Sequence, residues 1–133
     1  MSLDVGTELT VREFRVTRAD LVRYAGASGD FNPIHWSDRV ATAVGLPGVI
    51  AHGMYTFALA SRAVTGWAGD ASKVVTVAGR FTKPVVVPDD DEGADVTVAG
   101  RVTSVEDGLA TIELTVTHRD QKVLGMASAV VRC

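Results

Sequence analysis

Two residues that can transfer protons, Asp30 and His35, stand in the segment Ser-Gly-Asp-Phe-Asn-Pro-Ile-His. Their spacing does not place both on one helical face, but a turn through Asn32 and Pro33 can direct both side chains to the same side. A histidine exchanges protons near neutral pH, and a carboxylate beside it can hold one tautomer or position a water molecule. The alternative is that Asp30 and Asn32 only cap the turn while His35 is a hydrogen-bonded core residue. The spacing alone leaves both interpretations open.

A second cluster, Ile-Ala-His-Gly-Met at residues 50–54, stands at the start of an apolar segment that is expected to be helical. The free N–H groups and the positive dipole end of a helix N-terminus can hold a carbonyl oxygen that gains negative charge. Gly53 is the candidate donor, because a ligand can approach the glycine backbone closely. His52 can act on a substrate, but its simpler role is to cap or orient the neighbouring loop, and we assign it no catalysis.

Other polar residues give weaker indications of function. Ser61 either bonds back to a carbonyl of the preceding helical turn or meets a ligand, and the sequence does not separate these uses. His118 lies in an expected turn and Cys133 at the C-terminus, so both are expected to be exposed. The four acids at 89–92 predict a solvated loop and not a cation site, because they lack the spaced ligands and glycine turn of metal loops. The sequence has no Gly-x-Ser-x-Gly elbow and no phosphate-binding glycine loop.

Two helices are expected to position the acid–base candidates. Thr17 and Asp20 resemble a capping box, and apolar residues at helical spacing follow until Gly29 breaks the run. This helix would deliver the carboxylate to a loop. After the imidazole, Ser37 can cap a short helix over residues 38–44.

The rest of the chain predicts one long helix and a sheet around it. Residues 49–67 are apolar on nearly every face, which is typical of a buried helix. The runs that predict strands lie at residues 8–16, 73–87, 95–105, 109–117 and 122–131. Tight-turn compositions between the last three runs indicate an antiparallel meander, and prolines in the run at 73–87 indicate an edge position or a bulge. The fold class is therefore α+β, in one domain of residues 1–133.

Composition limits the function further. A chain of 133 residues with a hydrophobic fraction of 47% and a formal charge of −3 is expected to be a globular protein without a general grip on nucleic acid. The single cysteine excludes an intrachain disulfide and fits a reducing compartment. We see neither a signal peptide nor an apolar stretch long enough to span a membrane, so a cytoplasmic location is expected.

The sequence resembles the MaoC-like, (R)-specific enoyl-thioester hydratase and dehydratase family. The resemblance is carried by Tyr-Ala-Gly-Ala-Ser-Gly-Asp-Phe-Asn-Pro-Ile-His at 24–35, Ala-His-Gly-Met at 51–54 and Arg-Phe-Thr-Lys-Pro at 80–84. It implies a hot-dog fold, in which an antiparallel sheet wraps one central helix, and a dimer whose sheets join edge to edge. The small single-hot-dog members are most similar, including the catalytic B subunit of the dehydratases that act on (3R)-hydroxyacyl thioesters of acyl carrier protein (ACP) in mycolic-acid synthesis. A homodimer and a heterodimer with a non-catalytic hot-dog subunit both remain open.

The resemblance also implies roles for individual residues. Asp30 and His35 match the catalytic pair, and Asn32 matches the residue that braces their loop. Gly53 matches the backbone donor to the thioester carbonyl, and Ser61 matches a serine near the site in some members. The implied reaction adds water to a trans-2-enoyl thioester of CoA or ACP, or removes it from a (3R)-3-hydroxyacyl thioester, with no metal or redox cofactor. A thioesterase and a domain that only binds acyl thioesters are the alternatives, since the same fold hosts several functions.

Overall fold

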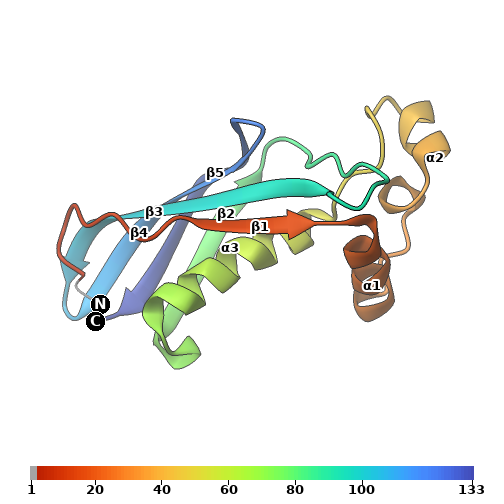
Figure 1. Cartoon of the computed structure of the whole chain (residues 1–133). Helices are drawn as coiled ribbons and strands as arrows, with labels where there is room; N and C mark the ends of the chain where they lie inside the picture. Colours follow the sequence, from red (N-terminus) through yellow and green to blue (C-terminus); the bar gives the residue numbers. More distant parts are fainter. Residues whose placement is uncertain (1–2) are drawn as a thin grey trace.

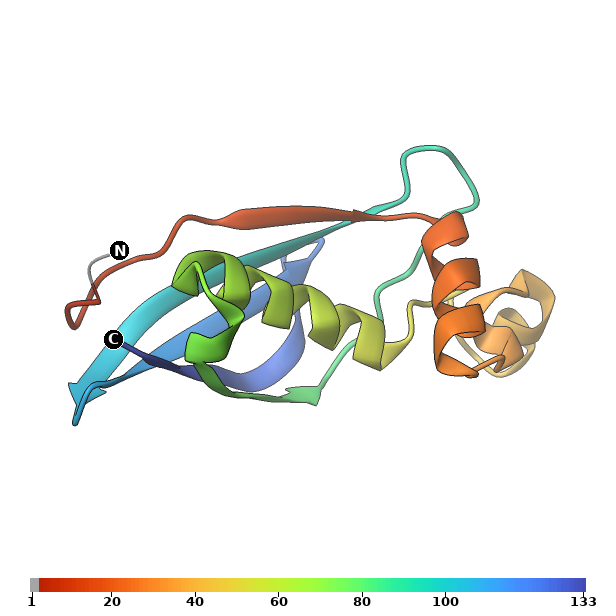
Figure 2. The same cartoon turned by 90° about the horizontal axis from the view of Figure 1, so that it is seen from below.

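A five-stranded antiparallel sheet curves around one face of helix α3 in the computed structural model, which describes residues 3–133 (Figure 1). Helices α1 and α2 lie beyond one end of the sheet, and the two chain termini lie near the other end (Figures 1 and 2). This is the α+β hot-dog architecture, so the fold class predicted from the sequence is confirmed.

The strands are β1 Arg12–Val16, β2 Val74–Phe81, β3 Ala94–Glu106, β4 Leu109–His118 and β5 Gln121–Arg132. Their order across the sheet is β1-β3-β4-β5-β2, so the last three strands form the predicted meander. Within residues 3–133, β2 pairs only with β5 and is an edge strand, as the prolines indicate. It ends at Phe81, earlier than the run at 73–87 predicts, because the chain leaves the sheet after Thr82 and residues 85–87 pair instead with the segment before α3.

Two tight turns join the strands of the meander. Asp107 and Gly108 have φ values of 54° and 76°, the left-handed values that favour an Asp-Gly pair. The turn between β4 and β5 has the same conformation at Arg119 and Asp120, with φ values of 51° and 59°. His118 just before it is only 8% exposed, so its expected exposure is wrong. Its ring nitrogen Nδ1 donates to the Asp95 carbonyl on β3, a cross-strand contact that local turn composition does not encode.

The helices are α1 Arg18–Ser28, α2 Asp38–Ala43 and α3 Gly53–Ala68, with 3-10 turns η1 Pro33–His35 and η2 Ala71–Lys73. The predicted capping box at Thr17 is present, and the Ser37 hydroxyl caps α2 by accepting from the Val40 N–H. No helix among residues 3–133 is both long and apolar enough to cross a membrane.

Helix α3 begins four residues later than the apolar pattern had predicted. Residues 49–51 are extended, because the Val49 carbonyl accepts from the Val87 N–H and the Ala51 N–H donates to the Val85 carbonyl. The helix is also not buried on every face, since Met54 is 55% exposed. Its covered face packs against β3 so closely that a Cβ at Gly100 would stand 2.8 Å from the Trp67 ring.

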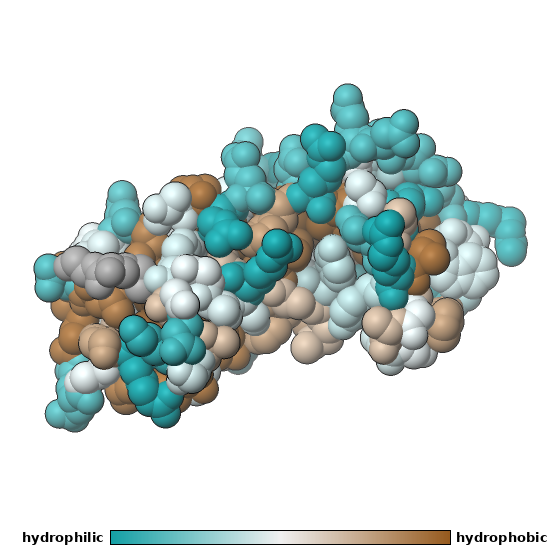
Figure 3. All heavy atoms as spheres, turned by 60° about the horizontal axis from the view of Figure 1, so that its bottom comes forward, coloured by the Kyte–Doolittle hydropathy of each residue, from teal (hydrophilic) through white to brown (hydrophobic). Residues whose placement is uncertain are grey.

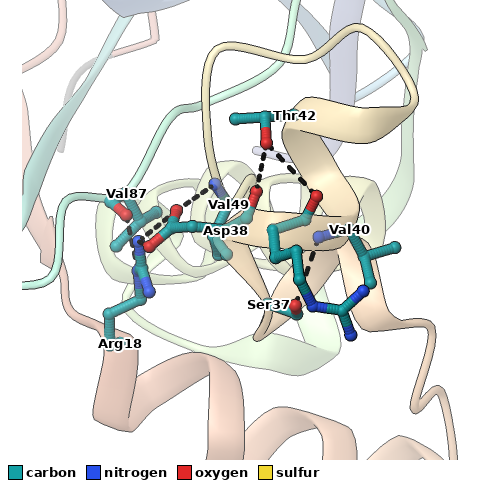
Figure 4. Close-up of polar contacts among 8 residues, drawn as sticks. Arg18, Ser37, Asp38, Val40, Thr42, Val49 and Val87 are labelled. Atoms are coloured by element: carbon teal, nitrogen blue, oxygen red, sulfur yellow. Dashed lines mark hydrogen bonds and ion pairs between the residues drawn. The ribbon is translucent and has the colours of Figure 1, made fainter.

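A polar clasp formed by Arg18 and Asp38 joins the two short helices to these extended segments (Figure 4). The Arg18 guanidinium donates to the Val87 carbonyl at 2.6 Å and to the Asp38 carboxylate at 2.9 Å. The same carboxylate accepts from the Val49 N–H at 3.0 Å. These two donors hold the pKa of Asp38 below its usual range, the Val49 N–H having the larger effect. The clasp fixes both ends of the region that carries Asp30 and His35.

Candidate active site

The loop after α1 is built from short side-chain-to-backbone hydrogen bonds. Gly29 ends the helix in the left-handed conformation with φ 77°, which a residue with a side chain rarely adopts. The Asp30 carboxylate then accepts from the Asn32 N–H at 3.1 Å, and the Asn32 side chain accepts from the Ile34 N–H at 3.2 Å. Asn32 therefore caps the 3-10 turn that begins at Pro33, and this holds the loop in one shape.

This loop brings Asp30 and His35 together. Nε2 of His35 lies 3.9 Å from Oδ2 of Asp30. Nδ1 of His35 donates to the Ile50 carbonyl at 2.7 Å, so Nε2 carries the lone pair of the neutral ring. The imidazole side chain is 8% exposed, whereas the carboxylate is 52% exposed. A water molecule can contact an oxygen and a nitrogen at this separation simultaneously.

The His52 ring contacts both residues of this pair. It is buried, its ring stacks on His35, and the edge of the Tyr24 ring packs against it. Nε2 of His52 donates to the Asp30 carbonyl at 3.1 Å, which leaves Nδ1 buried without a partner among residues 3–133. Burial lowers the pKa of His52, and the nearby His35 lowers it further. The orienting role expected from the sequence agrees with these contacts.

Gly53 is the first residue of α3, where an α-helix has no acceptors of its own for its N–H groups. The N–H groups of Tyr55 and Thr56 both donate to the His52 carbonyl, but that of Gly53 makes no hydrogen bond within the described part of the chain. A Cβ at Gly53 would stand 3.0 Å from the Phe81 ring. Because glycine has no side chain, the space between the free Gly53 N–H and the Phe81 ring stays unfilled.

A cavity of about 340 Å³ joins the two clusters. Its walls include His35 from η1, Gly53 and Thr56 from α3, and apolar side chains such as Ile34 and Val85. Such a cavity suits an apolar ligand that is oriented by a few polar groups. Lys83 stands where the cavity wall meets the surface.

Of the residues singled out from the sequence, Asp30, Asn32 and Ser61 do not line the cavity. Ser61 lies two helical turns beyond Gly53, and its hydroxyl donates to the Phe57 carbonyl at 3.1 Å, the back-bonding alternative. Thr56, by contrast, is a buried polar residue on the cavity wall that sequence reasoning missed. Its position three residues after Gly53, on the same helical face, is the signal that identifies it.

Asp30, His35 and His52 also place one potential metal-ligand atom each within 4.8 Å of the others. Two of the four imidazole nitrogens are already engaged, however, because His35 Nδ1 and His52 Nε2 face backbone carbonyls. The arrangement leaves the Asp30 carboxylate and His35 Nε2 as the accessible groups, which suits proton transfer.

Comparisons with known proteins agree with this architecture. A family model described as the MaoC like domain matches residues 4–122. The 3-hydroxyacyl-thioester dehydratase X of Mycobacterium tuberculosis is 43% identical over 74 residues, which are 56% of this chain and 25% of that protein. The match thus spans about a quarter of that relative's length.

Solved structures match over nearly the whole chain. A MaoC-like dehydratase is 40% identical with a TM-score of 0.93, over 97% of this chain and 40% of that one. An (R)-hydratase from A. caviae involved in PHA biosynthesis is 26% identical with a TM-score of 0.82, over 98% of this chain and 97% of that one. The protein therefore belongs to the MaoC-like dehydratase domain family.

Proposed function

We propose that this protein catalyses the reversible, (R)-specific hydration of trans-2-enoyl thioesters to (3R)-3-hydroxyacyl thioesters. The observation that carries the proposal is the 3.9 Å separation of the Asp30 carboxylate from Nε2 of His35, beside a cavity that also contains Gly53. The Asp30–His35 pair can transfer protons, and the Gly53 N–H can donate to a carbonyl oxygen. Hydration of a conjugated thioester requires both proton transfer and stabilisation of the carbonyl oxygen.

The proton-transfer pair activates a water molecule held between the carboxylate and the imidazole. One of the two groups accepts a proton as the water oxygen attacks C3 of the enoyl group, and a proton is then delivered to C2. His35 lines the cavity and the Asp30 carboxylate lies 3.9 Å from its Nε2, so in this proposal the oxygen and the proton come from the same side and the addition is syn. Because such groups share a proton, we assign the acid and base roles to the pair as a whole.

Gly53 stabilises the negative charge that develops on the thioester oxygen. Its free N–H and the dipole of α3 favour the enolate-like transition state more than the neutral thioester, and this difference accelerates the reaction. Asn32 holds the loop of the pair, and the apolar cavity wall accepts the acyl chain near the thioester. Ser61, farther along α3, stays a proposed substrate-binding residue.

A second hot-dog chain completes the assembly in this proposal, as a homodimer or as a heterodimer. The edge strand β2 is exposed along most of its length and presents Val75 and Phe81 to solvent. Figure 3 shows apolar side chains, in brown and beige, along the lower part of the molecule, interrupted by hydrophilic ones. An unpaired, weakly charged strand edge favours pairing with another strand. Light scattering on the purified chain should give twice its mass of 14.0 kDa if it forms a homodimer.

The enzymatic test measures two products on the same samples. Crotonyl-CoA and a longer enoyl-CoA are followed by loss of the conjugated enoyl absorbance, in parallel with an assay for free thiol. A hydratase removes the absorbance without releasing thiol. Release of thiol would identify a thioesterase, and no change with CoA or ACP thioesters would leave a binding domain, so either result would contradict the proposal.

A further inference from the structure

A second hollow, of about 450 Å³, adjoins the candidate active-site cavity. The two have Lys83 and Pro84 in common, so one wall continues into the other. The remaining wall comes from Pro47, Val86 and the turn between β4 and β5. No Asp or Glu side chain of residues 3–133 lines this hollow.

Lys83 and Arg119 give the hollow its positive charge. Both side chains are exposed, and neither has a carboxylate within ion-pair distance in the part of the chain that the structure describes. Arg18, by contrast, is held in its clasp by Asp38. Two cations on one concave surface without acidic neighbours in its wall create a positive potential that attracts an anion.

His118 supplies an independent sign that the hollow binds a ligand. It lines the hollow, and Nδ1 donates to the Asp95 carbonyl at 2.8 Å. Nε2 of the same ring is buried without a partner among the described residues, an arrangement that native structures rarely leave unsatisfied. The His118 ring therefore borders the hollow with one nitrogen that no described group satisfies.

We propose that this hollow binds the phosphate that ends the pantetheine arm of the thioester substrate. The inference rests on the proposed function, because CoA and ACP both present the reacting thioester on a phosphopantetheine arm. The arm would lie over Lys83 and Pro84 and place the thioester beside Gly53. Lys83 and Arg119 contact the phosphate, and the His118 ring forms part of the wall beside it.

Three crotonyl thioesters test this subsite: crotonyl-CoA, crotonyl-4′-phosphopantetheine and crotonyl-pantetheine, which has no phosphate. The double variant Lys83→Gln/Arg119→Gln should raise KM for crotonyl-CoA about tenfold or more, because charge-assisted contacts to phosphate are lost, with little change in kcat. KM for crotonyl-pantetheine should stay within about twofold, since it makes no such contact. Lys122→Gln is the matched control, because this exposed lysine follows the same turn but does not line the hollow.

The two phosphorylated substrates distinguish the carriers. An equal effect on both identifies the phosphate next to pantetheine, which CoA and ACP share. An effect confined to crotonyl-CoA identifies the additional phosphates of the nucleotide as the ligand. An effect that is the same for all three thioesters, or absent from all, overturns the phosphate site.

Binding measurements separate this proposal from the proposed function. Calorimetry with butyryl-CoA and butyryl-pantetheine, which have no double bond to hydrate, reports the subsite without chemistry. Tighter binding of butyryl-CoA that is lost in the double variant supports the subsite even if no enoyl thioester is turned over. Equal affinity of the wild-type protein for the two ligands contradicts it.

Discussion

The ring of His52 lies nearly parallel to that of His35, with centroids 3.8 Å apart and an interplanar angle of 22°. The same His52 ring donates to the Asp30 carbonyl. One buried side chain thus touches both members of the proposed catalytic pair, one through its face and the other through its edge. We therefore regard His52 as a positioning residue.

Two substitutions of His52 should separate these contacts. His52→Phe keeps a flat ring under His35 and removes the bond to Asp30, whereas His52→Gln keeps a donor and removes the aromatic face. Each should lower kcat about tenfold while KM changes little, because misplacement of the pair affects the chemical step more than binding. Steady-state hydration kinetics, with thermal denaturation to verify folding, measure the effect. Unchanged kcat in both variants would contradict the positioning role.

The lowered pKa of His52 makes stability depend on pH. The unfolded state takes up a proton near the ordinary histidine pKa of 6.5, and the folded state does so only at lower pH. Between those values the unfolded state binds more protons, so stability is full above about 6.5 and declines as the pH falls. Urea unfolding at pH 7.5 and 5.5 should show this decline, and His52→Phe should reduce it. An equal decline in the variant would assign the effect to other groups.

Replacing either member of the catalytic pair should lower turnover by at least about a hundredfold. Asp30→Asn keeps an acceptor for the Asn32 N–H and removes the charge, and His35→Ala removes the imidazole. Enoyl absorbance with crotonyl-CoA measures the rates. Binding of butyryl-CoA should persist in Asp30→Asn. Near-native turnover in either variant would exclude the assigned roles.

A methyl group at Gly53 should impair catalysis without unfolding the protein. The Cβ of Gly53→Ala would enter the passage beside the free N–H and meet the Phe81 ring, which is 60% exposed and can move aside. We expect kcat/KM to fall at least about tenfold, since oxyanion contacts contribute strongly to the rate. Gly26→Ala is the control, because its Cβ would meet nothing within 4 Å inside α1. That variant should keep full activity and gain about 0.5–1 kcal/mol of stability.

The clasp at Asp38 should be weakened by acid. Its lowered pKa means that the folded state favours the ionised carboxylate, so this contribution is present above about pH 4 and is lost as the pH falls further. Asp38→Asn should reduce the loss of stability between pH 5 and pH 3 in urea unfolding. Asp91→Asn, in the exposed acidic loop, is the control and should behave like the wild type. Identical curves for all three proteins would show that the clasp charge does not contribute.

Local sequence signals predicted the parts of the fold that local interactions determine. The capping box at Thr17 and the break at Gly29 placed α1 correctly, and the turn through Asn32 brought Asp30 and His35 together as expected. These features depend on neighbouring residues, which the sequence shows directly.

Features that depend on residues far apart in the sequence were harder to predict. An apolar run such as residues 49–52 suits a buried helix as well as an extended segment, and only its pairing with residues 85–87 decides. The burial of His118 likewise depends on β3. Whether Ser61 contacts substrate stays a prediction, since its back-bond to Phe57 leaves its use in a complex open.

The turn between β4 and β5 has a consequence for protein engineering. The left-handed conformation at Arg119 costs about 1–2 kcal/mol more than at a residue suited to it, and Asn at this position would relieve the strain. A redesign that optimises stability would therefore replace Arg119. On the proposed phosphate site, the thermostabilised protein would bind its carrier more weakly, so selection for heat resistance and selection for activity would act on this hairpin in opposite directions.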